Sequence, residues 1–541
     1  SYMSEFDIII VGAGSAGSIA ANRLSQDQNL KILILEAGPN NFHPMIKIPL
    51  GYGMTFYNKS INWNFYTSPQ LHLDNRRLYC PRGKVVGGSS SINAMIYARG
   101  FPSDFRNWTY DNSSFWSWEN IRKTYENMEK NIILTDKENA TSKIVVNNVS
   151  SQHHSILNNY FLGAKELDIP SVDSFNADNA EGVGHYDITT RNGYRWSAAD
   201  GFLKGTLTKN VKLTTQANVN QITVSDKKVT GVKYSKKGRN FEVSAKIGVV
   251  MAAGSIKTPH ILMLSGIGPS DHLKDFGIET KIDNPNIGSN LQDHIGIDYL
   301  YRSKVPTLNK SLGTVSGRIK SILEYLIFRS GPLSLSINQG GGFIRWKNRE
   351  DYPNLQVYFN PLTYSVSHAN KRPLLKTDKF DGFIIGFQPC RPNSRGNIRL
   401  LSKEINDDPL IDPGYLSNEK DLYDLECAYD FVRKISQTHS LDNIIDHPIG
   451  IDLIKSSAKE MISHFRQNAT SVYHPCGTCK MGPDKDTGVV SNRLKVHGLQ
   501  NLWVVDASVF PNITSGNINA PVMMTAYIGG NLISEDIKKL T

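Results

Sequence analysis

The sequence contains little cysteine and no long apolar segment. Its 541 residues include 5 cysteines, a small and odd number that cannot form the disulfide framework of a secreted protein. No apolar run reaches the roughly eighteen residues that a membrane-spanning helix needs. The first residues also lack the basic and apolar stretches of a secretion signal. The sequence therefore predicts a protein of the reducing cytoplasm.

Dense runs of lysine and arginine are absent too, although 60 Lys+Arg against 50 Asp+Glu give a formal net charge of +10. Without a basic stripe we expect no nucleic-acid partner. Two interpretations of the charge stay open. It is spread evenly over a large surface, which we favour, or it attracts the chain to an acidic substrate or to the inner face of an anionic membrane as a peripheral protein.

The chain is too long for one hydrophobic core, so about two domains are expected. Apolar runs typical of buried parallel strands occur at residues 6–11, 31–35, 247–251 and 502–505. Shorter strands are expected at 354–359, 382–388 and 396–401, and helices at 18–25, 256–264, 421–436 and 521–532. Because the parallel strands lie at the beginning, middle and end of the chain, one domain must be discontinuous, with another inserted into it.

A glycine-rich loop follows the first strand and opens the first helix. It reads Gly12-Ala13-Gly14-Ser15-Ala16-Gly17, and the next strand ends at Glu36. Glycines at this spacing let a pyrophosphate approach the backbone at a helix N-terminus, while the acidic residue binds ribose hydroxyls. The loop predicts one dinucleotide site but does not separate NAD from FAD, and residues 266–269 are not a second such loop.

Further motifs follow in a fixed order along the chain. They occupy residues 81–93, 254–259, 264–269, 286–294, 472–482, 505–511 and 515–521. Together with the glycine-rich loop they resemble the glucose–methanol–choline (GMC) oxidoreductases, and look most like bacterial FAD-dependent alcohol and choline dehydrogenases.

The resemblance implies an α/β fold with a discontinuous, Rossmann-like FAD-binding domain. It also implies an α+β substrate-binding domain with an antiparallel sheet. We expect the FAD-binding domain at 1–155, 190–300 and 466–541, and the substrate-binding domain at 156–189 and 301–465.

The resemblance also implies the chemistry, which is the oxidation of an alcohol, expected to be primary, to the aldehyde. His474 matches the base that removes the hydroxyl proton while hydride passes to flavin N5, and Asn517 matches a second active-site position. An asparagine there does not titrate but can donate to the developing alkoxide. The helix expected to begin at Pro521 would direct its N-terminus at the flavin.

The expected cofactor contacts combine the glycine-rich loop, Glu36 and the family motifs. They are Gly12, Gly14, Ser15, Ala16, Gly17, Glu36, Ala37, Arg82, Val86, Gly87, Gly88, Ser89, Asn93, Ala94, Val219, Ala253, Asp506, Ala507, Asn517, Asn519, Ala520 and Pro521. Some family members tether FAD through a histidine just before the asparagine of this motif, where this chain has Ile92. We therefore expect non-covalent FAD, a small alcohol as substrate, and oxygen or a quinone as electron acceptor.

Two other functions stay open. Cys390-Arg391-Pro392 resembles a segment of the light-driven fatty acid photodecarboxylases of this family, but no arginine lies between Arg399 and Tyr415 to hold a carboxylate. The second alternative is a flavin-binding structural protein whose catalysis has lapsed. The pair Cys476 and Cys479 lacks two further ligands at zinc spacing, so no metal is expected.

The segment from Gly38 to Cys80 is rich in aromatic residues. They are Tyr52, Phe56, Tyr57, Trp63, Phe65 and Tyr66. A lid or substrate channel, a membrane-facing patch and simple core packing are all compatible with such a segment.

Overall fold

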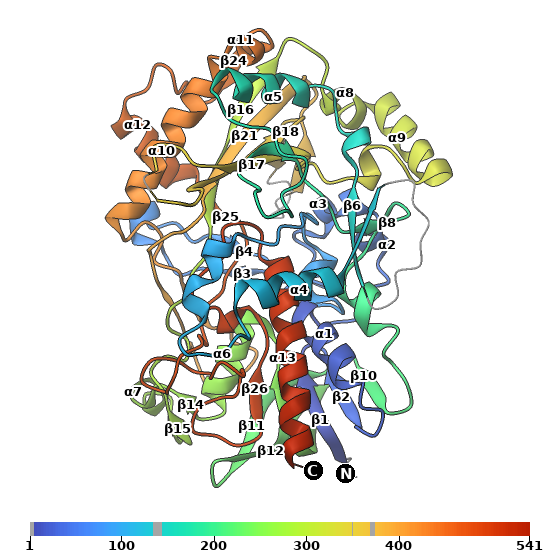
Figure 1. Cartoon of the computed structure of the whole chain (residues 1–541), viewed down its shortest axis with the longest axis vertical. Coiled ribbons are helices and arrows are strands. Elements are labelled where there is room, and N and C mark those ends of the chain that lie inside the picture. The colour runs from blue at the N-terminus through green and yellow to red at the C-terminus, as the bar shows by residue number, and fades with distance from the viewer. Residues whose placement is uncertain (1–4, 134–142, 349, 368–373, 541) are drawn as a thin grey trace.

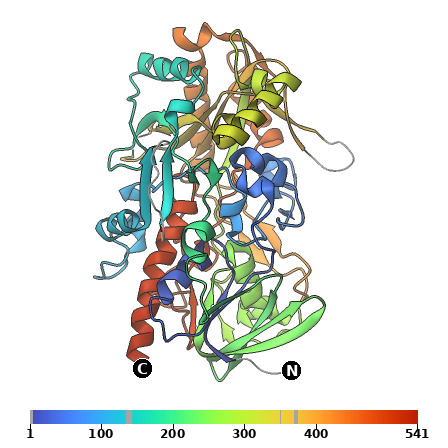
Figure 2. The same ribbon diagram turned by 90° about the vertical axis from the view of Figure 1, so that its right-hand side faces the viewer.

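The computed structural model describes residues 5–133, 143–348, 350–367 and 374–540. In Figure 1 the molecule has a lower half that contains both chain ends and an upper half built around a second sheet. The turned view in Figure 2 shows the same two halves stacked along the long axis.

The lower sheet is assembled from distant parts of the chain. Its strand order is β10-β2-β1-β13-β12-β11, and β26 also pairs with β13. The strands are β1 (Glu5–Val11), β2 (Ile32–Leu35), β10 (Val211–Thr214), β11 (Asn218–Ser225), β12 (Lys228–Lys236), β13 (Arg239–Met251) and β26 (Leu502–Val504). β10, β2, β1, β13 and β26 run parallel, so their carboxyl ends meet at one edge. The long apolar runs of the sequence therefore form the buried parallel core of this sheet.

Three helices connect to this edge of the lower sheet. They are α1 (Ser15–Leu24), α6 (Gly254–Leu264) and α13 (Asn519–Leu540). α1 and α13 pack side by side, and α13 runs from the centre of the molecule to the bottom in Figure 1. Their close approach requires Gly530, where a Cβ would lie 2.7 Å from the Cβ of Arg23.

The upper sheet is antiparallel throughout. Its order is β24-β16-β21-β18-β17-β7, and β25 also pairs with β16. The strands are β7 (Gly182–His185), β16 (Ile295–Ser303), β17 (Gly340–Ile344), β18 (Leu355–Asn360), β21 (Gly382–Pro389), β24 (Ile445–Ile449) and β25 (Thr470–Ser471). The domain boundaries expected from the sequence stay predictions.

Side chains alternate between the two faces of the upper sheet. Ile297, Phe387 and Val357 lie on the face that forms the upper hydrophobic core with α5 (Leu157–Glu166), α10 (Glu419–Ser436) and α12 (Ala458–Asn468). Their neighbours along the strands, among them Asp298 and Gln388, point to the opposite face. That face is directed toward the lower half.

The remaining elements are short or peripheral. They include α2 (Pro44–Lys47), α3 (Tyr52–Thr55), α4 (Trp118–Met128), α7 (Ser270–Lys274), α8 (Leu308–Leu312), α9 (Val315–Phe328), α11 (His439–Asp442) and the paired strands β3 (Phe65–Tyr66) with β4 (Tyr79–Cys80), β5 (Glu129–Ile133) with β6 (Ile144–Asn148), and β22 (Asn397–Arg399) with β23 (Leu410–Asp412).

The α/β fold with its second, antiparallel sheet confirms the predicted fold class, with differences in detail. The strand expected at 396–401 is the short β22, which pairs only with β23 and lies outside the upper sheet. α1 begins at Ser15 because the end of the glycine-rich loop is already helical. α13 begins at Asn519, so Pro521 lies in the first turn rather than at its first position, where its missing N–H still costs no helical hydrogen bond.

Candidate active site

A cavity of ≈ 560 Å³ lies between the carboxyl ends of the parallel strands and the inward face of the upper sheet. Leu35 and Ala252 line it from the lower sheet, while Asp298 and Gln388 line it from the upper sheet. Ligands of open α/β sheets bind at this edge of the strands. The two halves of the molecule therefore enclose one site.

Two glycine loops that are distant in sequence meet at the cavity wall. Gly12 has φ +102°, and a Cβ there would lie 2.5 Å from the carbonyl oxygen of Ala252. A Cβ on Gly88, which has φ +56°, would lie 2.7 Å from the Cα of Gly14. The Gly87 amide also donates to the carbonyl oxygen of Ala13 at 2.7 Å. Only glycine permits backbones to approach this closely, so side chains are excluded from this part of the wall.

Glu36 at the end of β2 is held by the same loop. Its carboxylate accepts hydrogen bonds from the amides of Ala13 at 3.1 Å and Gly38 at 2.8 Å, and it lines the cavity. Burial raises the pKa of Glu36 to about 7, against the opposing effect of the two amides. The side chain is thus oriented by the backbone before any ligand binds.

The N-termini of α1 and α13 converge on the cavity. The Ser15 hydroxyl donates to the Asn519 side-chain oxygen at 2.7 Å, and both residues line the wall. Helix N-termini carry a partial positive charge and unpaired amides. Their convergence makes this end of the cavity favourable for an anionic or electron-accepting group.

Two buried histidines form a hydrogen-bonded chain beside the cavity, which His474 lines. His474 Nδ1 lies 2.8 Å from His294 Nδ1, and His294 Nε2 lies 2.8 Å from the carbonyl oxygen of Cys390. Burial lowers the pKa of His294 to about 4. Burial, His294 and Arg82 hold the pKa of His474 well below its ordinary value. Both rings are therefore neutral at physiological pH.

The contacts of this chain determine which ring nitrogens carry protons. A carbonyl oxygen only accepts, so His294 Nε2 must be the protonated nitrogen. In a neutral ring His294 Nδ1 is then an acceptor, and His474 Nδ1 must donate to it. His474 Nε2 is left unprotonated, with its lone pair available to the cavity that His474 lines.

A chain of three amides faces that lone pair. Gln388 donates to the side-chain oxygen of Gln356 at 2.8 Å, and Gln356 donates to the side-chain oxygen of Asn517 at 3.1 Å. The Asn517 Nδ2 is thereby turned toward His474 Nε2, 3.4 Å away. The sequence identified Asn517 and His474, while the two glutamines that orient Asn517 were missed.

The backbone around His474 is held by a buried carboxylate. Asp293 accepts from the His474 amide at 2.8 Å and from the Ser471 hydroxyl at 2.6 Å, and Tyr415 donates to it as well. Tyr473 has φ +69°, which is unusual for a residue with a bulky side chain. The aspartate therefore stabilises a strained turn that presents the histidine to the cavity.

Comparison with known proteins identifies the family. The N-terminal model described as GMC oxidoreductase matches residues 6–296, and the C-terminal model of the same description matches 392–526. The chain is 36% identical to an alcohol dehydrogenase (acceptor) of Pseudomonas putida, covering 98% of this chain and 95% of that protein.

This chain is a GMC oxidoreductase. It is also 32% identical to an oxygen-dependent choline dehydrogenase of Brucella ovis, over 96% of this chain and 94% of that one. The solved structure of pyridoxine 4-oxidase from Mesorbium loti superposes with a TM-score of 0.85 at 29% identity, covering 97% and 98% of the two chains. These relatives bear out the predicted family and the enzyme class, an FAD-dependent oxidoreductase acting on CH–OH groups.

GMC oxidoreductases bind FAD, and the cavity of this one fits that cofactor. The glycine wall leaves room for a pyrophosphate against the backbone, Glu36 lines the cavity where it would accept hydrogen bonds from ribose hydroxyls, and two helix N-termini converge nearby. Most residues expected to contact the cofactor line the cavity. They are Gly12, Gly14, Ser15, Ala16, Glu36, Ala37, Arg82, Gly88, Ser89, Asn93, Ala94, Val219, Ala253, Asp506, Ala507, Asn517 and Asn519.

Five of the expected contacts do not reach the cavity wall. They are Gly17, Val86, Gly87, Ala520 and Pro521. Gly17 instead lets α1 pack on the loop, since a Cβ there would lie 1.8 Å from the Gly12 carbonyl oxygen. Among the aromatic residues of the 38–80 segment, Tyr52, Phe56, Tyr57, Trp63 and Phe65 line the cavity, whereas Tyr66 is exposed.

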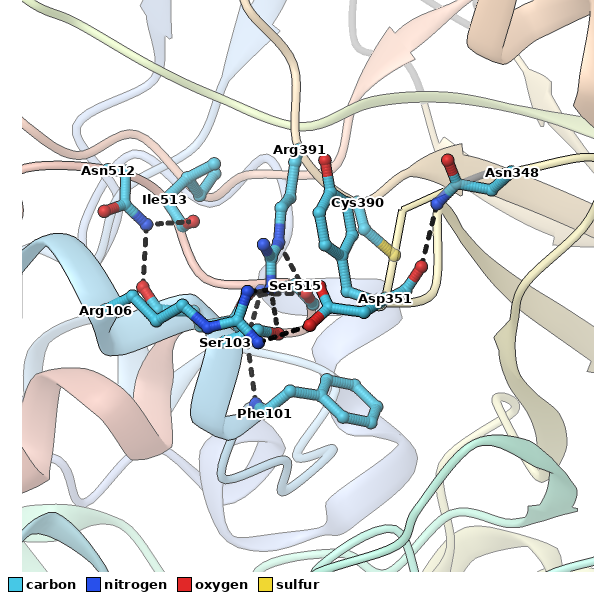
Figure 3. A network of polar contacts seen from close by, with 12 residues as sticks. Phe101, Ser103, Arg106, Asn348, Asp351, Cys390, Arg391, Asn512, Ile513 and Ser515 are labelled. Carbon is cyan, nitrogen blue, oxygen red and sulfur yellow. Dashed lines mark hydrogen bonds and ion pairs between the residues drawn. The ribbon is translucent and has the colours of Figure 1, made fainter.

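Arg391 is engaged in a polar network away from the cavity wall (Figure 3). Its guanidinium bonds Asp104 at 2.7 Å and the Ser103 hydroxyl at 2.6 Å. Asp104 also accepts from the amide and hydroxyl of Ser515, two residues before Asn517. The network thus fixes the loop that carries Asn517.

The cysteines show no sign of metal binding or redox pairing. All five are free and buried, and burial raises the pKa of the Cys476 and Cys479 thiols. Within the described ranges no group of three or more His, Cys, Asp or Glu side chains is arranged to hold a metal ion.

Proposed function

We propose that this GMC oxidoreductase oxidises a primary alcohol to the aldehyde with His474 as the base. The proposal rests on the contacts of the two histidines, which leave His474 Nε2 without a proton, and on the Asn517 amide that faces this nitrogen across 3.4 Å at the cavity. Bound FAD would supply the acceptor for the hydride that leaves the carbinol carbon. His474 Nε2 takes the hydroxyl proton, and the charge that forms on that ring is shared with His294 through the Nδ1 hydrogen bond.

Asn517 has the complementary role. Its Nδ2 donates to the substrate oxygen as negative charge develops there, and Gln356 keeps the amide in the donating orientation. The surrounding wall includes tyrosines and aliphatic side chains, and a low local dielectric beside them would strengthen both interactions.

Two observations favour this function over light-driven decarboxylation. The Cys390 side chain is fully buried and does not line the cavity. Arg391 is paired with Asp104 and is not available to hold a fatty acid carboxylate. The intact histidine chain and amide chain also argue against a lapsed enzyme, because buried polar groups are costly to keep in this arrangement.

We further propose that FAD is held without a covalent bond. Among the described residues that line the cavity, His474 is the one histidine and there is no cysteine, and the expected tether position is occupied by Ile92. We propose oxygen or a quinone as the electron acceptor, since one relative is named oxygen-dependent and another is named for an unspecified acceptor. We also propose that the enzyme acts in the cytoplasm or at a membrane face.

A positively charged alcohol is a second candidate substrate, favoured by Asp298. This β16 carboxylate is accessible from the cavity although protein surrounds it, and burial raises its pKa to about 6. Gly386 on β21 leaves the space for it, since a Cβ there would lie 2.3 Å from Asp298 Oδ1. Among the residues that the structure describes it has no ion-pair partner, and Tyr358 and Tyr364 lie near enough to feel its charge. An enclosed carboxylate beside aromatic rings is suited to an ammonium group such as that of choline.

Replacement of the base tests the proposed mechanism. His474→Ala should lower the rate of anaerobic flavin reduction by alcohol about 10²-fold or more, with FAD still bound. The matched control is His153→Ala, which breaks a similar but half-buried histidine pair, with His185 at 2.7 Å, outside the cavity. Near-normal reduction by the His474 variant would remove His474 from the role of base.

The state of the cofactor is tested by precipitating the pure protein with acid. Without a tether, the yellow colour should pass into the supernatant as free FAD. Colour retained in the pellet would mean that another side chain carries a covalent bond to the flavin.

The role of Asp298 is tested with choline and its neutral isostere, in which carbon replaces nitrogen. We expect kcat/KM to favour choline, and Asp298→Asn to reduce that preference about tenfold or more while the neutral alcohol is little affected. If the two substrates are used equally by wild type, or equally weakened by the variant, the carboxylate does not recognise a cation.

A further inference from the structure

Helix α9 lies on the outside of the upper half (Figure 1) and exposes large apolar side chains. Between 48% and 75% of the surface of each remains exposed in Val315, Ile319, Ile322, Leu323, Leu326, Ile327 and Phe328. With 3.6 residues per turn, the first six share one face of the helix, whereas Phe328, its last residue, points to another side. Scattered apolar residues are normal on a protein surface, but a shared helical face of them marks an interaction site.

The face that α9 turns inward is small and polar. Gly317 packs against α8, where a Cβ would lie 2.4 Å from the Lys310 carbonyl oxygen, and the Tyr325 hydroxyl donates to the Gly193 carbonyl oxygen at 2.9 Å. Ser321 is the third inward residue and is buried. This arrangement is the reverse of an ordinary surface helix, which turns its apolar stripe inward.

The charged residues of α9 lie at the borders of the apolar face or toward the inside of the molecule. With 3.6 residues per turn, the exposed Arg318 and Lys320 fall on opposite borders of the apolar face. The helix has one acidic residue, Glu324, which lies toward the inside next to Gly331. An apolar face bordered by cations is typical of helices that lie in the interface of a bilayer.

We propose that α9 is the surface by which this oxidoreductase binds an anionic lipid bilayer. The apolar side chains enter the boundary between headgroups and acyl chains, while Arg318 and Lys320 bind lipid phosphates. No described helix is long and apolar enough to cross a membrane. In the proposal α9 lies along the surface of the bilayer. A second copy of the chain fits this face poorly, because both copies would bring the same cations and no outward acid.

The position of α9 connects lipid binding to the cavity. The chain continues from α9 through Pro332–Ser334 to Ile337 and Asn338, which line the cavity. Docking therefore brings part of the cavity wall near the lipid, from which an apolar alcohol or a quinone could enter. This consequence rests on the proposed function, whereas the binding surface itself does not.

The surface is tested by sedimenting the FAD-loaded protein with vesicles. Wild type should sediment with vesicles of phosphatidylcholine and phosphatidylglycerol, and less with phosphatidylcholine alone. Ile319→Glu/Leu326→Glu should bind about tenfold more weakly or worse. Arg318→Gln/Lys320→Gln should lose mainly the preference for the anionic lipid.

The control variant is Leu162→Glu/Leu401→Glu, which adds the same charge at two exposed leucines outside α9. It should bind vesicles nearly as wild type does. Flavin content and activity on a water-soluble alcohol are measured for each variant, so that a failure of the proposed function is seen separately. Wild type that does not bind vesicles, or an Ile319→Glu/Leu326→Glu variant that binds equally, would overturn the proposal, as would a dimer in sedimentation velocity that this variant abolishes.

Discussion

Direct backbone packing at a few glycines is the constraint on which the rest of this structure depends. Gly12, Gly14 and Gly88 come from two distant segments, and at Gly12 and Gly88 a Cβ would lie within 2.7 Å of neighbouring backbone. The contact joins the first strand of the lower sheet to the loop that precedes the upper half. It also clears side chains from the wall where a pyrophosphate would bind. One steric condition thus shapes the wall of the cofactor site.

The upper sheet supplies the other half of the site through simple alternation. Because successive residues of a strand point to opposite faces, the residues that build the upper core leave their neighbours facing the cavity. The pairing of Gln356 with Gln388 across β18 and β21 then produces a chain of amides that ends at Asn517. The two hydrogen bonds between these amides set the direction of the Asn517 amide that faces the base.

Much of this was predictable from sequence because the signals are local. The glycine-rich loop, Glu36, His474 and Asn517 are recognised by their neighbours in the chain, and the structure brings them to one cavity. Gln356 and Gln388 escaped notice because their contact depends on strand register, which local pattern does not determine. His294 lies in a recognised motif, but the sequence does not show that it accepts a hydrogen bond from His474. That role follows from its other contact, in which His294 Nε2 donates to the Cys390 carbonyl oxygen. An ordinary surface helix turns its apolar face inward, whereas α9 exposes it. The face that a helix buries depends on what packs against it, which the local sequence does not reveal.

The central claim is that the two-histidine chain leaves His474 Nε2 unprotonated and directed at the cavity. Nitrogen NMR of the FAD-loaded protein with labelled histidine tests this most directly, with the His474 signals assigned by their loss in His474→Gln. We predict a neutral His474 ring at about pH 7, with its proton on Nδ1 and an unprotonated Nε2. A proton on Nε2 at this pH, whether from the other tautomer or from a charged ring, would contradict the account.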